Sequence, residues 1–93
     1  VLDSRDVLEN PRQMLIALCN LVQVPFLDSM LHWPAGQRET DGVWARHWYG
    51  NVEKSTGFGV YRPKDKEVPE RFQTLLEACE PLYQELAAHR ITV

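Results

Sequence analysis

The chain has 93 residues, which is enough for one small domain with a modest buried core. Hydrophobic residues make up 44% and charged residues 25%, ordinary values for a globular protein. The net charge of -3 argues against general nucleic-acid binding, because domains of that class carry a basic excess. No apolar run approaches the roughly 20 residues that a bilayer-crossing helix needs, so we expect no membrane segment.

The beginning of the chain, Val1 to Asp3, is typical of the last residues of a strand. Ser4 to Glu9 then follows as a predicted turn in which Asp6 caps nearby amides. An orphan strand end has no sheet to join within this chain. We therefore expect residues 1–93 to form a single C-terminal subdomain, a fragment of a longer chain that supplies the partners of the strand.

An amphipathic helix is predicted from Pro11 to Val22, with Asn10 as its N-cap and Pro11 in the first turn. Its apolar residues recur at helical spacing: Met14, Leu15, Leu18, Leu21 and Val22. Ile16 and Ala17 are also apolar, so only a narrow polar face remains on this helix. A helix of this kind is buried on more than one face, as in a larger protein.

The middle of the chain predicts short elements between breaks. A short helix from Ser29 to His32 begins after Asp28, and Pro34 ends it. A second helix is predicted from Trp44 to Ser55. Trp44 and Trp48 are four residues apart and share one helical face. We expect Trp44 to lie in the core and Trp48 between the core and a pocket.

The last third of the chain begins as an extended loop, Gly57 to Lys66, with Tyr61 as its expected anchor. A helix from Pro69 to Ala88 follows, and its apolar stripe consists of Phe72, Leu75, Leu76, Cys79, Leu82, Tyr83 and Leu86. Pro81 lies inside this pattern and removes one backbone hydrogen bond, so a kink or a split is predicted near Glu77 to Glu80.

The two cysteines, Cys19 and Cys79, each lie in an apolar helical pattern. There is no C-x-x-C pair, and the three histidines share no zinc-binding spacing with the cysteines. We predict buried free thiols rather than a disulfide or a metal site. Free thiols fit a reducing cytoplasm.

The segment from Gly36 to Phe58 combines aromatic, cationic and glycine residues at high density. Aromatic rings offer stacking faces, Arg and His offer donors to anions, and glycines let the backbone approach a ligand. The segment is therefore a candidate ligand-binding wall. The alternative is structural, because the same aromatics could form the core of a small domain.

The stretch VLDSRDVLENPRQMLIALCNLVQVPF, Val1 to Phe26, resembles the C-terminal portion of P-loop sulfotransferases. The following DSMLHWPAGQRETDGVWARHWYGNVEKSTGF and the closing PERFQTLLEACEPLYQEL are similar to a bacterial sulfotransferase-like branch that is sometimes labelled aminotransferase-like. The resemblance covers nearly the whole chain. Its specific part runs from W-P-x-G to D-G-x-W-x-x-H-W-Y.

This resemblance implies a mostly α chain that is the C-terminal helical part of an α/β P-loop fold. It implies a parent enzyme that moves a sulfuryl group from 3′-phosphoadenosine 5′-phosphosulfate to a small alcohol or amine acceptor. The phosphosulfate loop and the catalytic base of that family lie in its N-terminal part, and no Gly-rich loop with Lys-Ser/Thr occurs here. We therefore expect this chain to be inactive alone, with the remainder of the parent chain or another subunit as its partner.

The family closes a C-terminal lid over the nucleotide phosphate. The resemblance implies that Arg38 and the Asp41-Gly42-x-Trp44 run belong to that lid. A charge-assisted Arg bond suits a phosphate dianion, and Thr40 and the Gly42 amide add donors. The cofactor-binding candidates are therefore Arg38, Thr40 and Gly42.

On the acceptor side of such a lid, Trp48 and Tyr49 are the candidate substrate-binding residues, since an aromatic wall excludes water. His47 is a weaker candidate, for a general base, because a single His between Arg46 and Trp48 more often has a structural or surface role.

A stand-alone helical interaction module without catalysis is the alternative function, because the chain contains no complete catalytic constellation. Its core or partner surface would then consist of Leu15, Leu18, Phe72, Leu76 and Tyr83.

Overall fold

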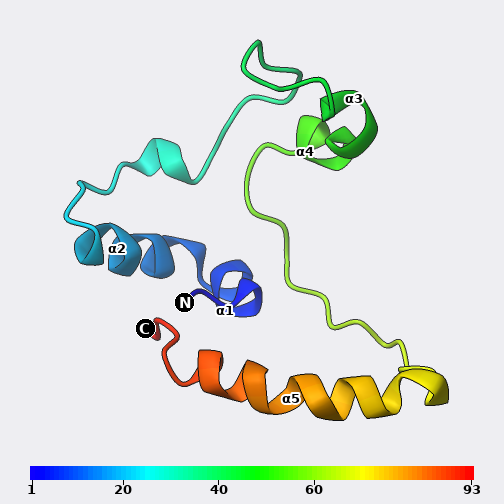
Figure 1. Ribbon diagram of the computed structural model, residues 1–93. Helices are drawn as coiled ribbons and strands as arrows, with labels where there is room; N and C mark the ends of the chain where they lie inside the picture. The colour runs from blue at the N-terminus through cyan, green and yellow to red at the C-terminus, as the bar shows by residue number, and fades with distance from the viewer.

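The computed structural model describes residues 1–93 and consists of helices joined by long connections (Figure 1). No strand is present, and the sole bridge pairs His32 with Gly57 in antiparallel fashion. The prediction of a mostly helical chain is confirmed. The helices are α1 (Ser4–Glu9), α2 (Pro11–Leu21), α3 (Ala45–Trp48), α4 (Gly50–Lys54) and α5 (Gln73–Ala87), with 3-10 turns η1 (Asp28–Met30) and η2 (Glu70–Phe72).

The turn predicted at Ser4 to Glu9 is wrong, because these residues form α1. Val1 to Asp3 pair with no strand in this chain, so the predicted strand end stays a prediction about partners outside it. Asp3 has extended backbone angles, φ −90° and ψ 132°, but it serves as the N-cap of this helix. Its carboxylate accepts the Arg5 backbone N–H at 2.9 Å. The cap is therefore Asp3 and not Asp6.

Helix α2 confirms the predicted amphipathic helix, with Pro11 in its first turn. The Asn10 side chain makes no capping hydrogen bond, contrary to expectation. At the other end, Gln23 adopts the left-handed φ of 58°, and the Val24 N–H returns to the Cys19 carbonyl at 3.0 Å. This closes the helix in the manner that glycine usually provides.

The predicted helix from Trp44 to Ser55 is two short helices, α3 and α4. The chain leaves the helical conformation at Tyr49, whose φ is −97° and ψ is 11°, directly before Gly50. The short helix expected at Ser29 to His32 is the 3-10 turn η1, which begins one residue earlier.

Helix α5 runs unbroken through Pro81, so the predicted split is wrong. Proline removes a single N–H donor, while its neighbours keep theirs. Pro81 is also exposed, so its ring faces solvent. Before α5, residues 58–69 have no regular structure, as predicted for this loop. Tyr61, its expected anchor, lies half-buried with the Arg5 guanidinium 5.4 Å from the ring centroid.

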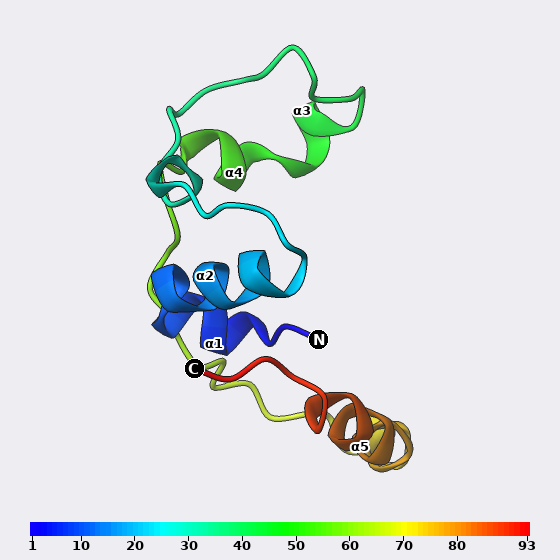
Figure 2. The same cartoon turned by 90° about the vertical axis from the view of Figure 1, so that its left-hand side faces the viewer.

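The chain is open rather than compact. Helices α3 and α4 lie at one end, α1 and α2 in the middle and α5 at the other end, as Figures 1 and 2 agree. The radius of gyration is 16.7 Å, against about 12 Å for a compact domain of this length. The accessible surface is 8244 Å², against about 5,500 Å² for a folded monomer of this mass. No helix is both long and apolar enough to cross a membrane.

A small core lies between α2 and the segment after η1. The buried residues are Met14, Cys19 and Leu31. The Cys19 Sγ lies 3.9 Å from the Met30 sulfur, which links η1 to α2. Burial of Cys19 is thus confirmed, whereas the expected burial of Cys79 is wrong, since that free thiol is exposed on α5.

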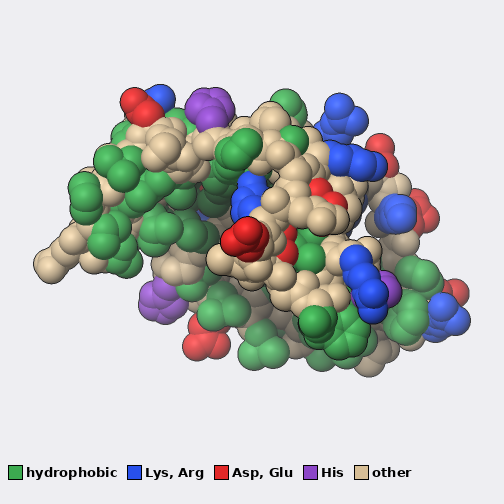
Figure 3. Space-filling view, turned by 90° about the horizontal axis from the view of Figure 1, so that it is seen from above, with side chains coloured by type: hydrophobic (Ala, Val, Ile, Leu, Met, Phe, Trp, Pro, Cys, Tyr) green, Lys and Arg blue, Asp and Glu red, His purple; other side chains and the backbone are tan.

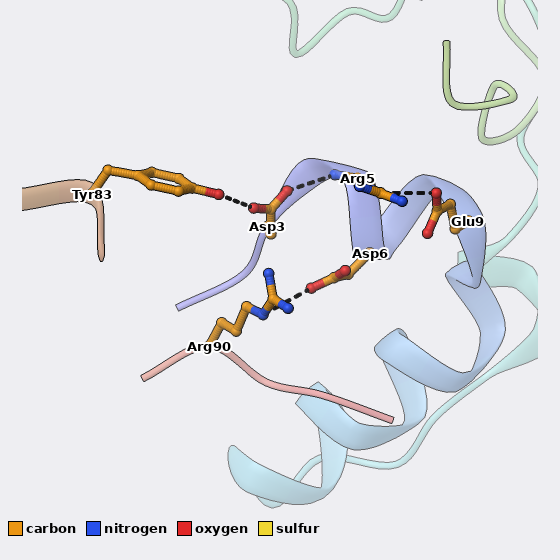
Figure 4. A network of polar contacts seen from close by, with 6 residues as sticks. All are labelled: Asp3, Arg5, Asp6, Glu9, Tyr83 and Arg90. Atoms are coloured by element: carbon orange, nitrogen blue, oxygen red, sulfur yellow. Dashed lines mark hydrogen bonds and ion pairs between the residues drawn. The ribbon is translucent and has the colours of Figure 1, made fainter. Parts of the chain in front are cut away.

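The two ends of the chain are tied together by polar contacts that we call the terminal clasp (Figure 4). The Tyr83 hydroxyl donates to the Asp3 carboxylate at 2.9 Å. The Arg90 Nε lies 3.6 Å from the Asp6 carboxylate, and the Ile91 N–H donates to the Val1 carbonyl at 3.0 Å. Helix α5 is therefore held at its C-terminal end by hydrogen bonds and one ion pair.

These contacts shift two pKa values in opposite directions. The Arg5 backbone N–H, followed by the Tyr83 hydroxyl, lowers the pKa of Asp3 from its ordinary value. The same carboxylate raises the pKa of Tyr83, because the hydroxyl donates to it.

Candidate functional site

A cavity of about 350 Å³ lies between the loop after Pro34 and the two short helices α3 and α4. We call it the arginine cavity. Its lining residues are Gln37, Arg38, Asp41, Gly42, Val43, Ala45, Arg46 and Glu53. It brings together Arg38 and Gly42, two of the three candidate nucleotide-binding residues. Thr40, the third, does not line it.

The loop that carries Arg38 is a tight turn closed at both sides. The Arg38 N–H donates to the Asp41 carboxylate at 3.1 Å, and the Asp41 N–H donates to the Arg38 carbonyl at 3.0 Å. The Arg38 guanidinium donates to the Pro34 carbonyl at 3.2 Å. These bonds engage one of its five N–H donors and leave the others for a ligand.

Helix α4 fixes this loop from the other side. The Gly36 N–H donates to the Glu53 carbonyl at 2.7 Å. Gly36 has a φ of 119°, a conformation that a residue with a Cβ rarely adopts. The loop and α4 are thus joined at the edge of the arginine cavity.

Charges of both signs line the arginine cavity. Arg38 and Arg46 bring two guanidinium groups, while Asp41 and Glu53 bring two carboxylates. One oxygen of Glu53, Oε1, is buried and has no hydrogen-bond partner. A buried carboxylate oxygen without a donor is unfavourable, so a ligand with both anionic and hydrogen-bond donating groups suits this cavity.

Sequence reasoning missed Arg46 as a cavity residue. Its guanidinium Nε donates to the His47 Nε2 at 3.1 Å, and the Trp44 and His47 rings are 6.3 Å apart. A general base needs a free nitrogen lone pair. In this arrangement the Nε2 lone pair of His47 is occupied, so His47 abstracts a proton only after Arg46 moves away.

The predicted core position of Trp44 is wrong, since 67% of it is exposed. Trp48 is 73% exposed, so its expected place between core and pocket is also wrong within this chain. Tyr49 is exposed as well. The reason is that α3 contacts only α4, and no other element covers the indole rings. These aromatics lie outside the arginine cavity and form an open surface.

No group of three His, Cys, Asp or Glu side chains converges as metal ligands would. The arginine cavity offers guanidinium groups, carboxylates and backbone amides to a ligand.

Comparison with known proteins gives one family and two relatives. A family model described as a sulfotransferase domain matches residues 1–90. Branched-chain-amino-acid aminotransferase-like protein 2 of Arabidopsis thaliana is 38% identical over 89 residues. Branched-chain-amino-acid aminotransferase-like protein 1 of the same plant is 39% identical over 89 residues. Each alignment covers 96% of this chain and 16% of the relative, and no solved structure matches.

Proposed function

Because this chain belongs to the sulfotransferase domain family, we propose that it is the C-terminal lid subdomain of a sulfotransferase-like enzyme. In this proposal the complete protein has an α/β P-loop fold and transfers a sulfuryl group from 3′-phosphoadenosine 5′-phosphosulfate to an alcohol or amine. The phosphosulfate loop comes from the remainder of the protein. The observation that carries the proposal is the meeting of Arg38, Gly42 and Arg46 on one cavity.

A nucleotide suits this cavity better than a bare anion does. The 3′-phosphate is a dianion, and guanidinium groups bind phosphate through paired, charge-assisted hydrogen bonds. A bare anion would be attracted by Arg38 and Arg46 but repelled by the carboxylates of Asp41 and Glu53, and it would bring no donor for those carboxylates. A nucleoside adds hydroxyl and amino donors, which could satisfy the buried Oε1 of Glu53. Thr40 is kept in the proposal as a donor that reaches the phosphate only when the lid closes.

The acceptor side of the proposed site is the open aromatic surface of α3. Trp48 and Tyr49 line the acceptor once the remainder of the protein covers them. His47 acts as a base only if its bond from Arg46 is released. We also propose a bacterial sulfotransferase-like origin. A reducing cytoplasm is the proposed location, which the two free thiols fit.

The exposed surface supports a role as part of a larger assembly. The chain exposes about 2,700 Å² more than a compact monomer of its mass, several times what one partner of a standard interface buries. Along α5 and η2, apolar residues stay open to solvent: Phe72, Leu75, Leu76, Leu82, Tyr83 and Leu86. This surface also favours the second candidate, a helical interaction module without catalysis. Nucleotide binding separates the two.

The decisive experiment is calorimetric titration of the complete protein with 3′-phosphoadenosine 5′-phosphate. Arg38→Ala should weaken binding by about 1.5–3 kcal/mol, and Arg46→Ala by a similar amount, since each removes a charged hydrogen-bond donor. Arg62→Ala is the matched control, because Arg62 lies on the extended stretch outside the cavity. Unchanged affinity in both cavity variants would leave this loop a structural role only.

A second test uses the 93-residue chain by itself. It should show no sulfuryl transfer, because it contains no phosphosulfate loop. Turnover by the purified chain would contradict the proposed division of labour between this subdomain and the remainder of the protein.

A further inference from the structure

A second cavity, of about 550 Å³, lies where the segment after η1 meets the chain that leaves α4, close to the start of α2. We call it the Lys54 pocket. Its lining residues are Pro11, Leu31, His32, Lys54, Ser55, Thr56, Gly57, Phe58 and Gly59. None of them is acidic, although the chain as a whole carries a net charge of -3. In this respect it differs from the arginine cavity, where carboxylates match the arginines in number.

Trp33 fixes the walls of the Lys54 pocket. Its backbone N–H donates to the Thr56 carbonyl at 3.0 Å, and its indole N–H donates to the Ser55 hydroxyl at 2.8 Å. The Ser55 hydroxyl in turn donates to the Val52 carbonyl at 2.7 Å. The Trp33 and Phe58 rings meet edge to face, 5.4 Å apart. The pocket is thus shaped before any ligand arrives.

Close backbone approach keeps the two walls together. A Cβ at Gly57 would lie 3.1 Å from the Leu31 carbonyl oxygen and 3.5 Å from the His32 Nδ1. Glycine at this position therefore lets the bridge between His32 and Gly57 form, which brings the two walls of the pocket together.

Three donors of this pocket are free. The Lys54 ammonium has no carboxylate partner within ion-pair distance. The His32 ring and the Thr56 hydroxyl make no side-chain hydrogen bond. A cation with two further donors and no competing carboxylate is the arrangement that binds oxyanions.

We propose that the Lys54 pocket binds a sulfate or phosphate group. Lys54 supplies the charge, and the His32 ring and the Thr56 hydroxyl supply hydrogen bonds. The cavity is larger than a single ion, and Leu31, Phe58 and Pro11 offer apolar surface beside the donors. The bound group therefore belongs to a larger molecule with an apolar portion. This site shares no lining residue with the arginine cavity and does not depend on the proposed nucleotide site.

The test is calorimetric titration of the complete protein with inorganic phosphate and with phenyl phosphate. Lys54→Gln should weaken the binding of phenyl phosphate at least about tenfold, the loss expected for one charged contact. Thr56→Val should weaken it about three- to tenfold, while Lys66→Gln, outside the pocket, should leave it unchanged. Tighter binding of phenyl phosphate than of inorganic phosphate is the expected sign that the apolar surface takes part. Equal affinity for inorganic phosphate and phenyl phosphate would show that the pocket binds a free ion, and would overturn the proposal that its ligand has an apolar portion.

Arg38→Ala separates this proposal from the nucleotide site. Affinity for phenyl phosphate should persist in this variant and be reduced at least about tenfold in Lys54→Gln. The reverse pattern would assign the anion to the arginine cavity and overturn the Lys54 pocket. Circular dichroism of Lys54→Gln should match that of the native protein, since Lys54 is exposed at the end of α4. If Lys54→Gln has the native circular dichroism spectrum and also the native affinity for phenyl phosphate, the proposal is overturned.

Discussion

Helices α2 and α5 have similar sequences in one respect, since each carries an apolar stripe that includes a cysteine. Their surroundings differ. Helix α2 buries Met14 and Cys19, because α1 and the segment after η1 cover one side of it. Helix α5 buries nothing and is held by the terminal clasp at one end. An apolar stripe thus becomes core only where a second element covers it.

The exposed apolar residues are not confined to α5. Figure 3 shows apolar side chains gathered most densely at the left of the view from above, with others along the lower edge and at the right. The end of α2 and the loop after it contribute Leu21, Val22, Val24 and Leu27, all exposed. The covered side of α2 is therefore a small closed core within a larger open surface, and four substitutions test that contrast.

Met14→Ala should have the largest effect. Met14 is 1% exposed, and a buried Met replaced by Ala costs about 2–5 kcal/mol in lost burial and residual cavity. The measurement is urea unfolding of the complete protein. Gln13→Ala, at the exposed neighbour on the same helix, should stay within about 0.5 kcal/mol. Equal losses at the two positions would show that this core is not formed.

Leu75→Ala tests whether the stripe of α5 is covered in the complete protein. If α5 packs on the remainder of the protein, the free energy of unfolding should fall by about 2–3 kcal/mol. Glu77→Ala on the same helix should have almost no effect. Leu75 is 62% exposed in this chain. A small loss in the free energy of unfolding on Leu75→Ala would therefore mean that no other part of the complete protein covers α5, unlike α2.

Ser55→Ala should have an intermediate effect. It removes the acceptor of the Trp33 indole N–H, a half-buried bond worth about 0.5–1.5 kcal/mol. Unfolding of the complete protein measures the loss, and Ser29→Ala, whose hydroxyl makes no hydrogen bond, is the control. A loss no larger than that of the control would show that the walls of the Lys54 pocket do not depend on this bond.

Tyr83→Phe should have the smallest effect on stability, because its hydrogen bond to Asp3 lies at the exposed surface. The variant should move the pKa of Asp3 upward, toward but not to its ordinary value, since the Arg5 N–H still lowers it. A carboxyl titration followed by NMR measures this, with Tyr61→Phe as control. An unchanged pKa would show that the hydroxyl does not contact Asp3 in solution.

The sign of the pH dependence follows from the two shifts. The pKa of Asp3 is lowered, so its contribution is complete above about pH 4 and is lost as pH falls through the lowered value. The pKa of Tyr83 is raised, so its contribution is complete below about pH 10 and is lost as pH rises through the raised value. The contact between Tyr83 and Asp3 should therefore weaken at both extremes of pH and be strongest between them.

Much of the helical pattern was predictable from the sequence. Long apolar periodicity together with Pro11 located α2, and the same periodicity located α5. Helix α1 escaped prediction because six residues give too short a pattern, and the extended Asp3 resembles a strand end. One feature of the sequence does indicate this helix: Asp3 lies three residues before Asp6, which is the spacing of an N-cap residue and an acidic residue in the first turn.

The sites were only partly predictable. Composition and the family resemblance led to Arg38 and Gly42, which do share a cavity. We did not predict that Arg46 lines the arginine cavity or that Trp33 bonds to the walls of the Lys54 pocket. Both depend on how short helices and loops pack against one another, which the local sequence pattern does not determine. The orientation of Trp44 was wrong for a related reason. Spacing of four residues shows that two side chains share a face, but it does not say whether another element covers that face.

The terminal clasp has a consequence for how the chain behaves when separated from its surroundings. Bringing together the ends of a flexible chain of this length costs about 4 kcal/mol of entropy, and more with the fixed part of the loop-closure term. A few solvent-exposed polar contacts cannot offset that alone. Where surrounding structure already holds the ends near each other, the same contacts form at a high effective concentration. The bond between Tyr83 and Asp3 is thus a local reporter of whether the chain between these two residues is assembled.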